Sequence, residues 1–363
     1  MTIPQHTIWE IEPHTLAKHE ILRRYLGAWF PILSTHNRKV VYIDGFCGPG
    51  RYKGGEVGSP IIALREALKH SKRLDNNQVA FLFMDERDDR IAHLKGELQK
   101  FPIPSNFFVQ AEAGQFEHKL GKLLNNLEAE GLRLAPTFAF IDPFGFKGLS
   151  FDLVRRLLIN SKTEVFVNVM VDAVNRFLEH PDQQTRQHIV DLFGTKQVLK
   201  IAQRPCNRVI ELRLLYQKQL SKHARFVRYF EMRNCHGRTI YCLFFASNHP
   251  LGHVKMKEAF WKVDTSSGLC FSDATNPNQL VLFEIDGTPE LAGDLLRFFG
   301  GQRVSVEQVK KYVEDATPFV ATHMRGALRS LEDEKQITVG EFKLNGKKRR
   351  RNTYPKDVVI DFT

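Results

Sequence analysis

The sequence has 363 residues, of which 42% are hydrophobic and 26% charged, and its formal net charge is +11. This composition is typical of a soluble globular protein and excludes a disordered chain, and no apolar run reaches the roughly 18 residues of a membrane span. The length favours two domains. The N-terminus has no visible signal peptide, which predicts a cytoplasmic protein. The basic charge favours nucleic acid as a partner.

Helices and short apolar segments alternate through the first half of the sequence. Helical spacing predicts an opening helix at about 13–34, and further helices at about 59–71, 87–100 and 150–160, with another that ends near 130. Between them lie five apolar runs, at 39–44, 79–85, 107–111, 137–142 and 164–170. Buried strands separated by helices indicate a parallel sheet that is covered on both faces.

The pattern changes after the fifth predicted strand. Residues 172–223 are expected to form a helical insertion, and 226–232 and 239–246 alternate like an antiparallel hairpin. A hairpin after five parallel strands is the usual end of a methyltransferase sheet. The sequence therefore predicts a Rossmann-like methyltransferase sheet, with five parallel strands plus an antiparallel hairpin, in an α/β domain over 1–275.

The C-terminal part, 276–363, predicts a small winged helix-turn-helix domain. A strand at 279–286 precedes helices at 287–299, 305–314 and 319–335, and short strands at 337–339 and 343–344 flank a basic hairpin tip. The expected phosphate contacts are two arginines of the last helix and the basic run of the wing: Arg325, Arg329, Lys347, Lys348, Arg349, Arg350 and Arg351. The alternative for the basic run is a solvated cluster of charges.

The segment from Asp44 to Gly50 (DGFCGPG) is the strongest local signal. Glycines at 48 and 50 allow the backbone to approach a ligand closely, and the segment follows a buried strand and matches the D-x-F-x-G-x-G pattern of methyltransferase cofactor loops. Asp44, Phe46, Gly48 and Gly50 are therefore candidate contacts of S-adenosylmethionine. The alternative is an ordinary glycine turn.

Acids at the ends of the next two strands support this cofactor. Asp85 and Glu86 follow the second strand, where an acid accepts hydrogen bonds from ribose hydroxyls, and Glu86 is favoured because Asp85 can cap the following helix. Glu112 follows the third strand and can accept from the adenine amine, although a solvated glutamate is an equal alternative.

A second motif, Asp142-Pro143-Phe144-Gly145, follows the fourth strand. Methyltransferases that act on exocyclic base amines carry Asn/Asp/Ser-Pro-Pro-aromatic at this position, and the same Asp-Pro-Phe-Gly string is similar to one in tRNA guanine-26 dimethyltransferases. An acceptor must hold the amine, and an aromatic ring must stack on the flipped base. The alternative is a Pro-Gly turn that begins with an acid. The four residues are candidate catalytic residues.

The chain also resembles the three-Cys-motif partner proteins (TcmP). The resemblance rests on the two motifs above and on four further strings: Lys18-His19-Glu-Ile-Leu, Tyr25-Leu-Gly-Ala-Trp29, Gly58-Ser59-Pro60 and Glu164-Val-Phe-Val-Asn168. It spans most of the first 260 residues, and the C-terminal module is similar to the winged helix attached to many members. The resemblance implies a methyltransferase-like fold and a partner, a radical S-adenosylmethionine-like protein with three cysteines.

One departure from the usual methyltransferase pattern bears on whether the protein is an active enzyme. In most methyltransferases the helix begins directly after the last glycine of the cofactor loop, whereas here residues 51–58 intervene. Arg51 and Lys53 in this segment are expected to face phosphate, and the segment can also act as a lid or change how the methionine end of the cofactor is held. A catalytically inactive specificity subunit therefore stands as the alternative to an enzyme.

Metal chemistry is not expected. The five cysteines are scattered, and none forms a Cys-x-x-Cys pair. A metal-dependent nuclease that uses Asp44, Asp85 and Asp142 is a weak third hypothesis, because these acids are better explained as contacts at strand ends.

Overall fold

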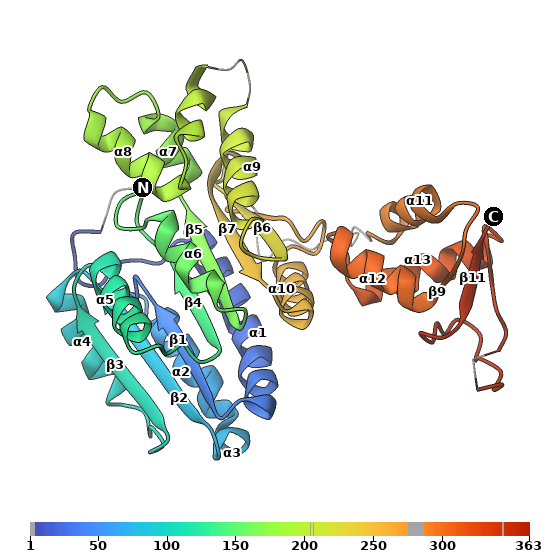
Figure 1. Cartoon of the computed structure of the whole chain (residues 1–363), viewed down its shortest axis with the longest axis horizontal. Coiled ribbons are helices and arrows are strands. Elements are labelled where there is room, and N and C mark those ends of the chain that lie inside the picture. Colours follow the sequence, from blue (N-terminus) through green and yellow to red (C-terminus); the bar gives the residue numbers. More distant parts are fainter. Residues whose placement is uncertain (1–3, 204, 206, 275–286, 343–344) are drawn as a thin grey trace. The chain divides into compact units, whose positions relative to one another are not determined.

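The computed structural model describes residues 4–203, 205, 207–274, 287–342 and 345–363 (Figure 1). The chain divides into two compact units. The first contains Met1–Ala259 and Cys270–Pro277, and the second contains Phe260–Leu269 and Asn278–Thr363. No helix in the described ranges is both long enough and apolar enough to cross a membrane.

An eight-stranded sheet organises the first unit. Its strands are β1 (Lys39–Asp44), β2 (Gln78–Asp85), β3 (Phe107–Ala113), β4 (Thr137–Ile141), β5 (Thr163–Val169), β6 (Phe226–Arg233), β7 (Thr239–Ser247) and β8 (Cys270–Ser272). Their order is β3-β2-β1-β4-β5-β7-β6-β8; β1–β5 are mutually parallel, and β7 is antiparallel to both β5 and β6. The five parallel strands and the hairpin predicted from the sequence are therefore confirmed.

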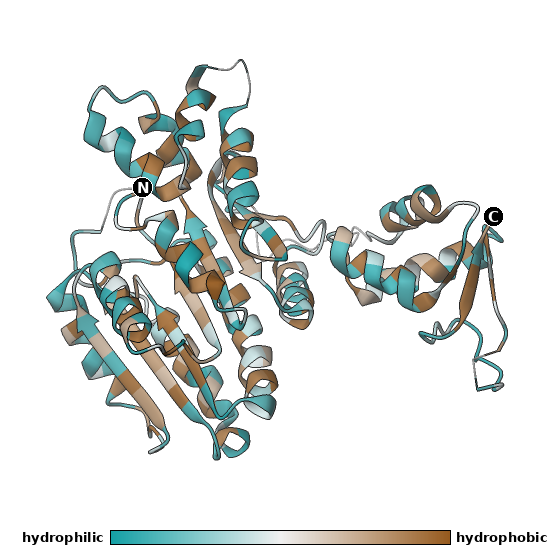
Figure 2. Ribbon diagram, viewed as in Figure 1, coloured by the Kyte–Doolittle hydropathy of each residue, from teal (hydrophilic) through white to brown (hydrophobic). Residues whose placement is uncertain are grey.

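Helices cover both faces of this sheet, with α1 and α2 on one face and α5 and α6 on the other (Figure 1). The helices of this part are α1 (Pro13–His36), α2 (Ser59–Lys69), α3 (Ser71–Leu74), α4 (Asp88–Leu98), α5 (Phe116–Ala129), α6 (Phe151–Ile159), α7 (Val171–Phe177), α8 (Gln183–Phe193), the 3-10 helix η1 (Lys196–Gln203), α9 (Arg208–Leu220) and α10 (Pro250–Val263). Every residue of β4 and β5 is buried, and hydrophobic residues run along the strands in Figure 2. This explains why these strands are mainly apolar in the sequence.

The strand order reverses between β1 and β4. From β1 the chain moves outward through β2 and β3, whereas from β4 it moves in the opposite direction to β5. Ligands of open α/β sheets bind at such a reversal, beyond the carboxyl ends of the strands. Asp44 ends β1 and Asp142 directly follows β4, so the two sequence motifs meet at this point.

The second unit has the element order of a winged helix. It contains α11 (Thr288–Phe299), β9 (Arg303–Ser305), α12 (Val306–Ala316), α13 (Ala321–Asp333), β10 (Ile337–Val339) and β11 (Val359–Phe362). The strands form an antiparallel sheet in the order β10-β11-β9. Leu295, Val309, Leu328 and Ile360 are among the residues of its apolar core.

Two strand predictions in this part of the chain need comment. The predicted strands 279–286 and 343–344 lie outside the described residues. The partner of β10 is β11, which pairs Ile337 with Phe362. The basic run 347–351 therefore lies in the connection between β10 and β11, which is the position of a wing.

Candidate functional site

Backbone hydrogen bonds fasten the segment 45–50 to the ends of the strands. The Gly45 amide donates to the Phe140 carbonyl (3.0 Å) and the Cys47 amide donates to the Met84 carbonyl (2.9 Å). Gly48 and Gly50 have φ angles of 63° and 81°, in the left-handed region that favours glycine. A β-carbon on Gly50 would come within 2.6 Å of the Leu94 side chain. Gly50 is thus favoured by its backbone conformation, and a β-carbon there would have to displace the end of the Leu94 side chain.

Asp85 holds this loop against the end of β2. Its Oδ2 accepts from the Gly48 amide (3.0 Å), its Oδ1 accepts from the Arg87 amide (3.0 Å), and the Arg90 guanidinium lies 3.6 Å away. Asp85 is buried, whereas Glu86 is exposed. The structure therefore gives Asp85 a positioning role and leaves Glu86 accessible for a ribose.

Asp44 is a fully buried carboxyl group at the end of β1. Burial outweighs its hydrogen bonds and, together with the charge of Asp142, raises the pKa of Asp44 to about 7. Its Oδ2 accepts from the Tyr42 hydroxyl (3.4 Å), while its Oδ1 has no hydrogen-bond partner among the described residues. An unpaired buried carboxylate oxygen fits a cationic ligand group, such as the α-amino group of S-adenosylmethionine.

The inserted residues 51–58 form a small hairpin. Arg51 and Val57 make an antiparallel bridge, and the Gly58 amide donates to the Gly50 carbonyl (2.9 Å). The Arg51 guanidinium donates to Glu97 (2.8 Å) and so stabilises the hairpin against α4. Its expected phosphate contact stays a prediction. Lys53 remains largely exposed and pairs with Glu10 at 3.3 Å.

Residues 4–12 cross the glycine loop. The Trp9 carbonyl accepts from the Lys53 amide (2.8 Å), and the Trp9 ring contacts Tyr52 and Phe144 edge-on, with centroids 5.4 and 5.8 Å away. The Arg90 guanidinium lies 4.7 Å from the centroid of the Trp9 ring. A β-carbon on Gly48 would face this ring at 3.6 Å, so Trp9 covers Gly48 in this conformation.

Two cavities border the connection between β4 and α6. Their volumes, about 370 and 500 Å³, are large enough for a nucleobase. The larger, of about 500 Å³, lies beyond the ends of β4, β5 and β7 and is lined by Pro4, Trp9, Glu10, Glu12, His14, Thr15, Lys18, Tyr52, Asp142, Pro143, Phe144, Gly145, Asn168, Met170, Ala173 and Tyr241. The predicted catalytic motif, Asp142 to Gly145, forms one side of it. Four aromatic side chains contribute walls on which a base can stack.

Asp142 is fixed from two sides within the larger cavity. Its Oδ1 accepts from Asn168 Nδ2 (2.8 Å), and its Oδ2 pairs with the Lys18 ammonium. Lys18 is buried and lies 5.3 Å from the centroid of the Tyr241 ring. A carboxylate has about four acceptor positions, so Asp142 retains capacity for a further donor.

A second charged group, around His14, lies at the larger cavity. His14 is buried between Glu12 and Asp273, with N–O distances of 3.1 and 2.9 Å. Burial lowers the pKa of His14, but the two carboxylates outweigh burial and leave the pKa above its usual value. Charge in this cavity is thus mixed rather than uniformly negative.

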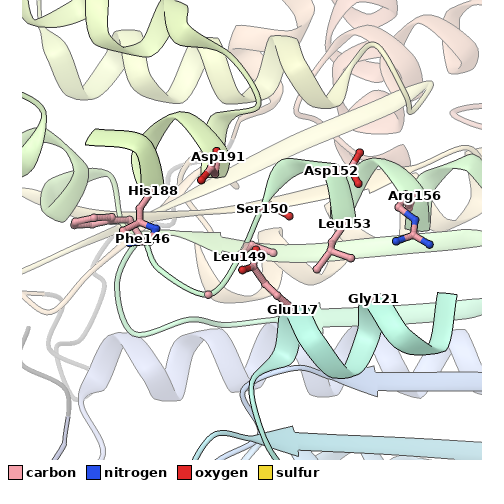
Figure 3. Close-up of a pocket in the computed structure, with 11 residues that line it drawn as sticks. Glu117, Gly121, Phe146, Leu149, Ser150, Asp152, Leu153, Arg156, His188 and Asp191 are labelled. Atoms are coloured by element: carbon pink, nitrogen blue, oxygen red, sulfur yellow. The ribbon is translucent and has the colours of Figure 1, made fainter. Parts of the chain in front are cut away.

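The smaller cavity, of about 370 Å³, lies among α5, α6 and α8 (Figure 3). Glu117, Asp152 and Asp191 contribute three carboxylates to its lining, and Asp152 and Asp191 already pair with Arg155 and Gln187. The larger cavity also has three carboxylates in its lining, so charge does not separate the two cavities. The smaller cavity has Phe146 in its lining, whereas the larger has four aromatic side chains and is therefore the better candidate for stacking on a nucleobase.

Glu112 does not join the two motifs. It pairs with Lys119 (2.8 Å), and hydrogen bonds from Lys119 and Gln110 lower the pKa of Glu112. An adenine amine would have to compete with Lys119 for this carboxylate. The expected adenine contact stays a prediction.

The second unit presents its basic residues in two groups. Arg325 and Arg329 are exposed on α13, four residues apart on one helix face, and Arg329 pairs weakly with Asp333 at 3.8 Å. In the wing, Lys347, Lys348, Arg350 and Arg351 are exposed or nearly so. These exposed side chains are the ones predicted to contact phosphate, and that contact stays a prediction.

Arg349 differs from its neighbours because its side chain is only 8% exposed. It pairs with Glu332 on α13 and donates to the Gly340 carbonyl (2.9 Å), and Glu332 also accepts from Tyr354 (2.8 Å). Arg349 therefore holds the wing to α13 in this conformation, and its predicted phosphate contact stays a prediction.

We expect Arg349→Ala to lower the free energy of unfolding by about 1.5–3 kcal/mol, the range for hydrogen bonds to charged groups. Lys347→Ala, which removes an exposed charge from the same run, should change it by less than about 0.5 kcal/mol. Denaturant unfolding followed by circular dichroism measures both. Equal stabilities of the two variants would contradict the structural role of Arg349.

Several residues of the site were not predicted as functional from the sequence. Lys18 and Asn168 were named only within the sequence strings that carry the family resemblance. Trp9 and Asp273 were not named. The polar Asn168 lies near the end of a strand whose preceding residues, 165–167, are apolar, much as Asp44 and Asp85 do, and this signal could have identified it. Trp9 lies in a segment without periodicity, so its position over Gly48 had no local signal.

Comparisons with known proteins bear on each unit. Residues 271–340 match the family described as the GMT-like wHTH domain. No curated protein matches the sequence.

Solved structures that are similar to the chain include protein LPL1258 from Legionella pneumophila, with 15% identity, 70% of this chain and 91% of that chain covered, and a TM-score of 0.41. Human methyltransferase-like protein 13 in complex with SAH is 8% identical, with coverage of 74% and 96% and a TM-score of 0.36. The O-methyltransferase from Bacillus cereus in complex with SAH is 12% identical, with coverage of 67% and 84% and a TM-score of 0.34. By its strand order the first unit has a methyltransferase-like fold, and the second contains a winged helix-turn-helix domain.

Proposed function

We propose that the protein is an S-adenosylmethionine-dependent methyltransferase that acts on an exocyclic amine of a base in DNA or RNA. The observation that carries the proposal is the placement of Asp142 in an aromatic-lined cavity of about 500 Å³ at the reversal of the sheet. The glycine loop and the unpaired oxygen of Asp44 lie at the end of the adjacent strand β1. This adjacency supports the proposal of one transfer site that joins a cofactor and a base.

Each group has a distinct role in this proposal. Asp44, Phe46, Gly48, Gly50 and Glu86 hold the cofactor, which when bound supplies a methyl group made electrophilic by the positive sulfonium. Asp142 accepts a hydrogen bond from the target amine and can receive the proton that the amine loses. Phe144 and the neighbouring rings stack on the base. The winged helix binds the surrounding phosphates.

Cofactor affinity should depend on pH through Asp44. Because the pKa of Asp44 is about 7, its carboxylate form is scarce at pH 6 and predominant at pH 7.5. We expect the affinity for S-adenosylmethionine to rise about fivefold or more across this range, below the pH at which the ligand's own α-amino group, near 8, loses its proton. Isothermal titration calorimetry measures the dissociation constant at each pH.

The control for this experiment is Asp44→Asn, which keeps the shape and removes the titration. Its cofactor affinity should be weak and nearly independent of pH. The same burial also predicts that the free energy of unfolding of the wild type falls as pH rises from about 4 to 7, because the folded Asp44 retains its proton where the unfolded one has lost it. A wild-type affinity that is flat with pH would exclude a contact between Asp44 and the ammonium group.

A second candidate function is supported by Trp9. Its ring covers Gly48, and the Pro4 and Gln5 carbonyls accept from Arg90 (2.8 Å) and Arg87 (2.6 Å) beside Asp85. This would suit a catalytically inactive, nucleic-acid-binding specificity subunit, such as a partner of a radical S-adenosylmethionine-like three-Cys-motif protein. Absence of cofactor binding at millimolar concentration in the calorimetry would favour this function over the enzyme.

A further inference from the structure

Asn168 carries a buried acceptor whose partner is missing from the described part of the chain. The residue is 3% exposed, lies near the end of β5 and lines the larger cavity. Its Nδ2 donates to Asp142 Oδ1 (2.8 Å) and lies 3.6 Å from the Met170 sulfur, whereas Oδ1 has no hydrogen-bond partner among the described residues. A buried acceptor of this kind carries an energetic cost, so a site that retains one calls for an explanation.

Chemistry fixes the orientation of this amide. An ionised carboxylate only accepts hydrogen bonds, and Asp142 forms an ion pair with Lys18. The amide NH₂ of Asn168 must therefore face Asp142, because the flipped orientation would bring two acceptors together. The unpaired atom at this position is thus an oxygen, and what it lacks is a donor.

The two acceptors are neighbours because β4 and β5 are in parallel register. Ile141 pairs with Val167, so Asp142 and Asn168 follow at adjacent strand ends. The direct hydrogen bond between their side chains places the carboxylate and the amide side by side in the cavity wall.

We propose that Asn168 Oδ1 is the second acceptor for the target amine, so that the site recognises a primary amine through both of its N–H groups. Asp142 accepts one hydrogen and Asn168 accepts the other. This inference rests on the proposed function and makes its substrate class narrower. The exocyclic amines of adenine, cytosine and guanine offer two donors, whereas the carbonyl groups of uracil, thymine and hypoxanthine offer none at the same position.

A consequence follows for the methylated product. A monomethylated amine has one N–H and cannot satisfy both acceptors, and a dimethylated amine satisfies neither. The product should therefore bind less tightly than the substrate, and transfer should stop after one methyl group.

The test compares short single strands that differ only in one central base, bound to the full-length protein in the presence of SAH. The central base carries an unmodified, a monomethylated or a dimethylated exocyclic amine, or it is the deaminated base. Separate series use adenine, cytosine and guanine. The winged helix contributes equally to every member of a series, so affinity ratios report on the cavity. For the wild type, we expect one series in which the monomethyl base binds about five- to tenfold less tightly than the amine.

Asn168→Leu removes the acceptor, and with it the amide donor to Asp142, with little change in volume. It should reduce the ratio of amine to monomethyl affinity to near one, because only Asp142 remains to accept. Asn175→Leu is the matched control, since Asn175 Oδ1 is also buried without a partner in the described ranges but is not among the residues that line the cavity. The control should keep the wild-type ratio. Asn168→Ala serves if the leucine disturbs folding, as judged by circular dichroism.

The outcomes separate this inference from the function on which it rests. If the wild type prefers the amine over the deaminated base but binds the monomethyl base equally well, or if Asn168→Leu retains the wild-type ratio, the second-acceptor role is wrong and the proposed function stands. If no series distinguishes amine from deaminated base, the base-amine function itself is wrong. The wild-type comparison requires no variant and decides the matter even if both substitutions prevent folding.

Discussion

Replacing Asp142 by asparagine is expected to reduce methyl transfer by about a hundredfold or more, the scale observed when one positioned polar group is removed from an active site. The substitution also leaves the buried Lys18 ammonium without its carboxylate partner. Breaking a buried ion pair costs about 3–5 kcal/mol, so this variant alone cannot separate catalysis from stability. Transfer of a labelled methyl group to bulk tRNA and to genomic DNA measures the first effect, and the melting temperature measures the second.

The double variant Lys18→Met with Asp142→Asn resolves the two effects. Removing both charges restores stability, because no uncompensated cation remains at this position. If Asp142 contacts the amine, transfer stays low in the double variant although its melting temperature recovers. Recovery of transfer together with stability would show that Asp142 is a structural partner of Lys18, and the catalytic assignment would be withdrawn.

The second large effect is expected in the wing. Lys347, Lys348 and Arg351 are exposed, so replacing all three by alanine should remove up to three phosphate contacts without disturbing the Arg349–Glu332 pair. Each phosphate contact that the variant removes should reduce the slope of log affinity against log salt by about 0.7–0.9. Binding to short DNA and RNA duplexes across a salt series measures the slope and indicates which nucleic acid is preferred.

A matched control removes the same charge from elsewhere. Lys72, Lys122 and Lys218 lie on α3, α5 and α9 of the first unit, and their replacement by alanine gives the same change in net charge. This triple variant should keep the wild-type slope. Equal slopes for the wild type and the wing variant would mean that the basic run does not contact phosphate.

The strands of the sheet were predictable because they are buried on both faces. In β4 and β5 every side chain is buried, and a continuous apolar run leaves little ambiguity. Asp44 and Asp142 were equally visible, since each is the first acid after such a run. By contrast, β8 has only three residues, all half-buried, and such a segment shows no period that a sequence reveals.

The rest of the site depends on contacts between residues that are distant in sequence. Lys18 meets Asp142 across 124 residues, and nothing in the helical pattern of α1 distinguishes a buried lysine from an exposed one. Likewise, Arg349 donates its hydrogen bonds to Glu332 and to the Gly340 carbonyl, which lie outside the basic run, so the five basic residues appeared uniform in the sequence. Sequence patterns locate strand ends well, but they do not show which charges neutralise one another.

The contacts of His14 determine when the cavity can be completed during synthesis of the chain. The ribosome releases His14 early, yet its carboxylate partner Asp273 lies 259 residues later, and the Tyr241 hydroxyl that donates to the His14 carbonyl (3.3 Å) also follows β1–β5. Closing so long a loop is slow relative to forming the local βα units. A nascent chain can thus assemble its parallel strands while His14 still lacks Asp273. Translation that terminates before this residue should release a protein with its central strands formed and with His14 deprived of one of its two carboxylate partners.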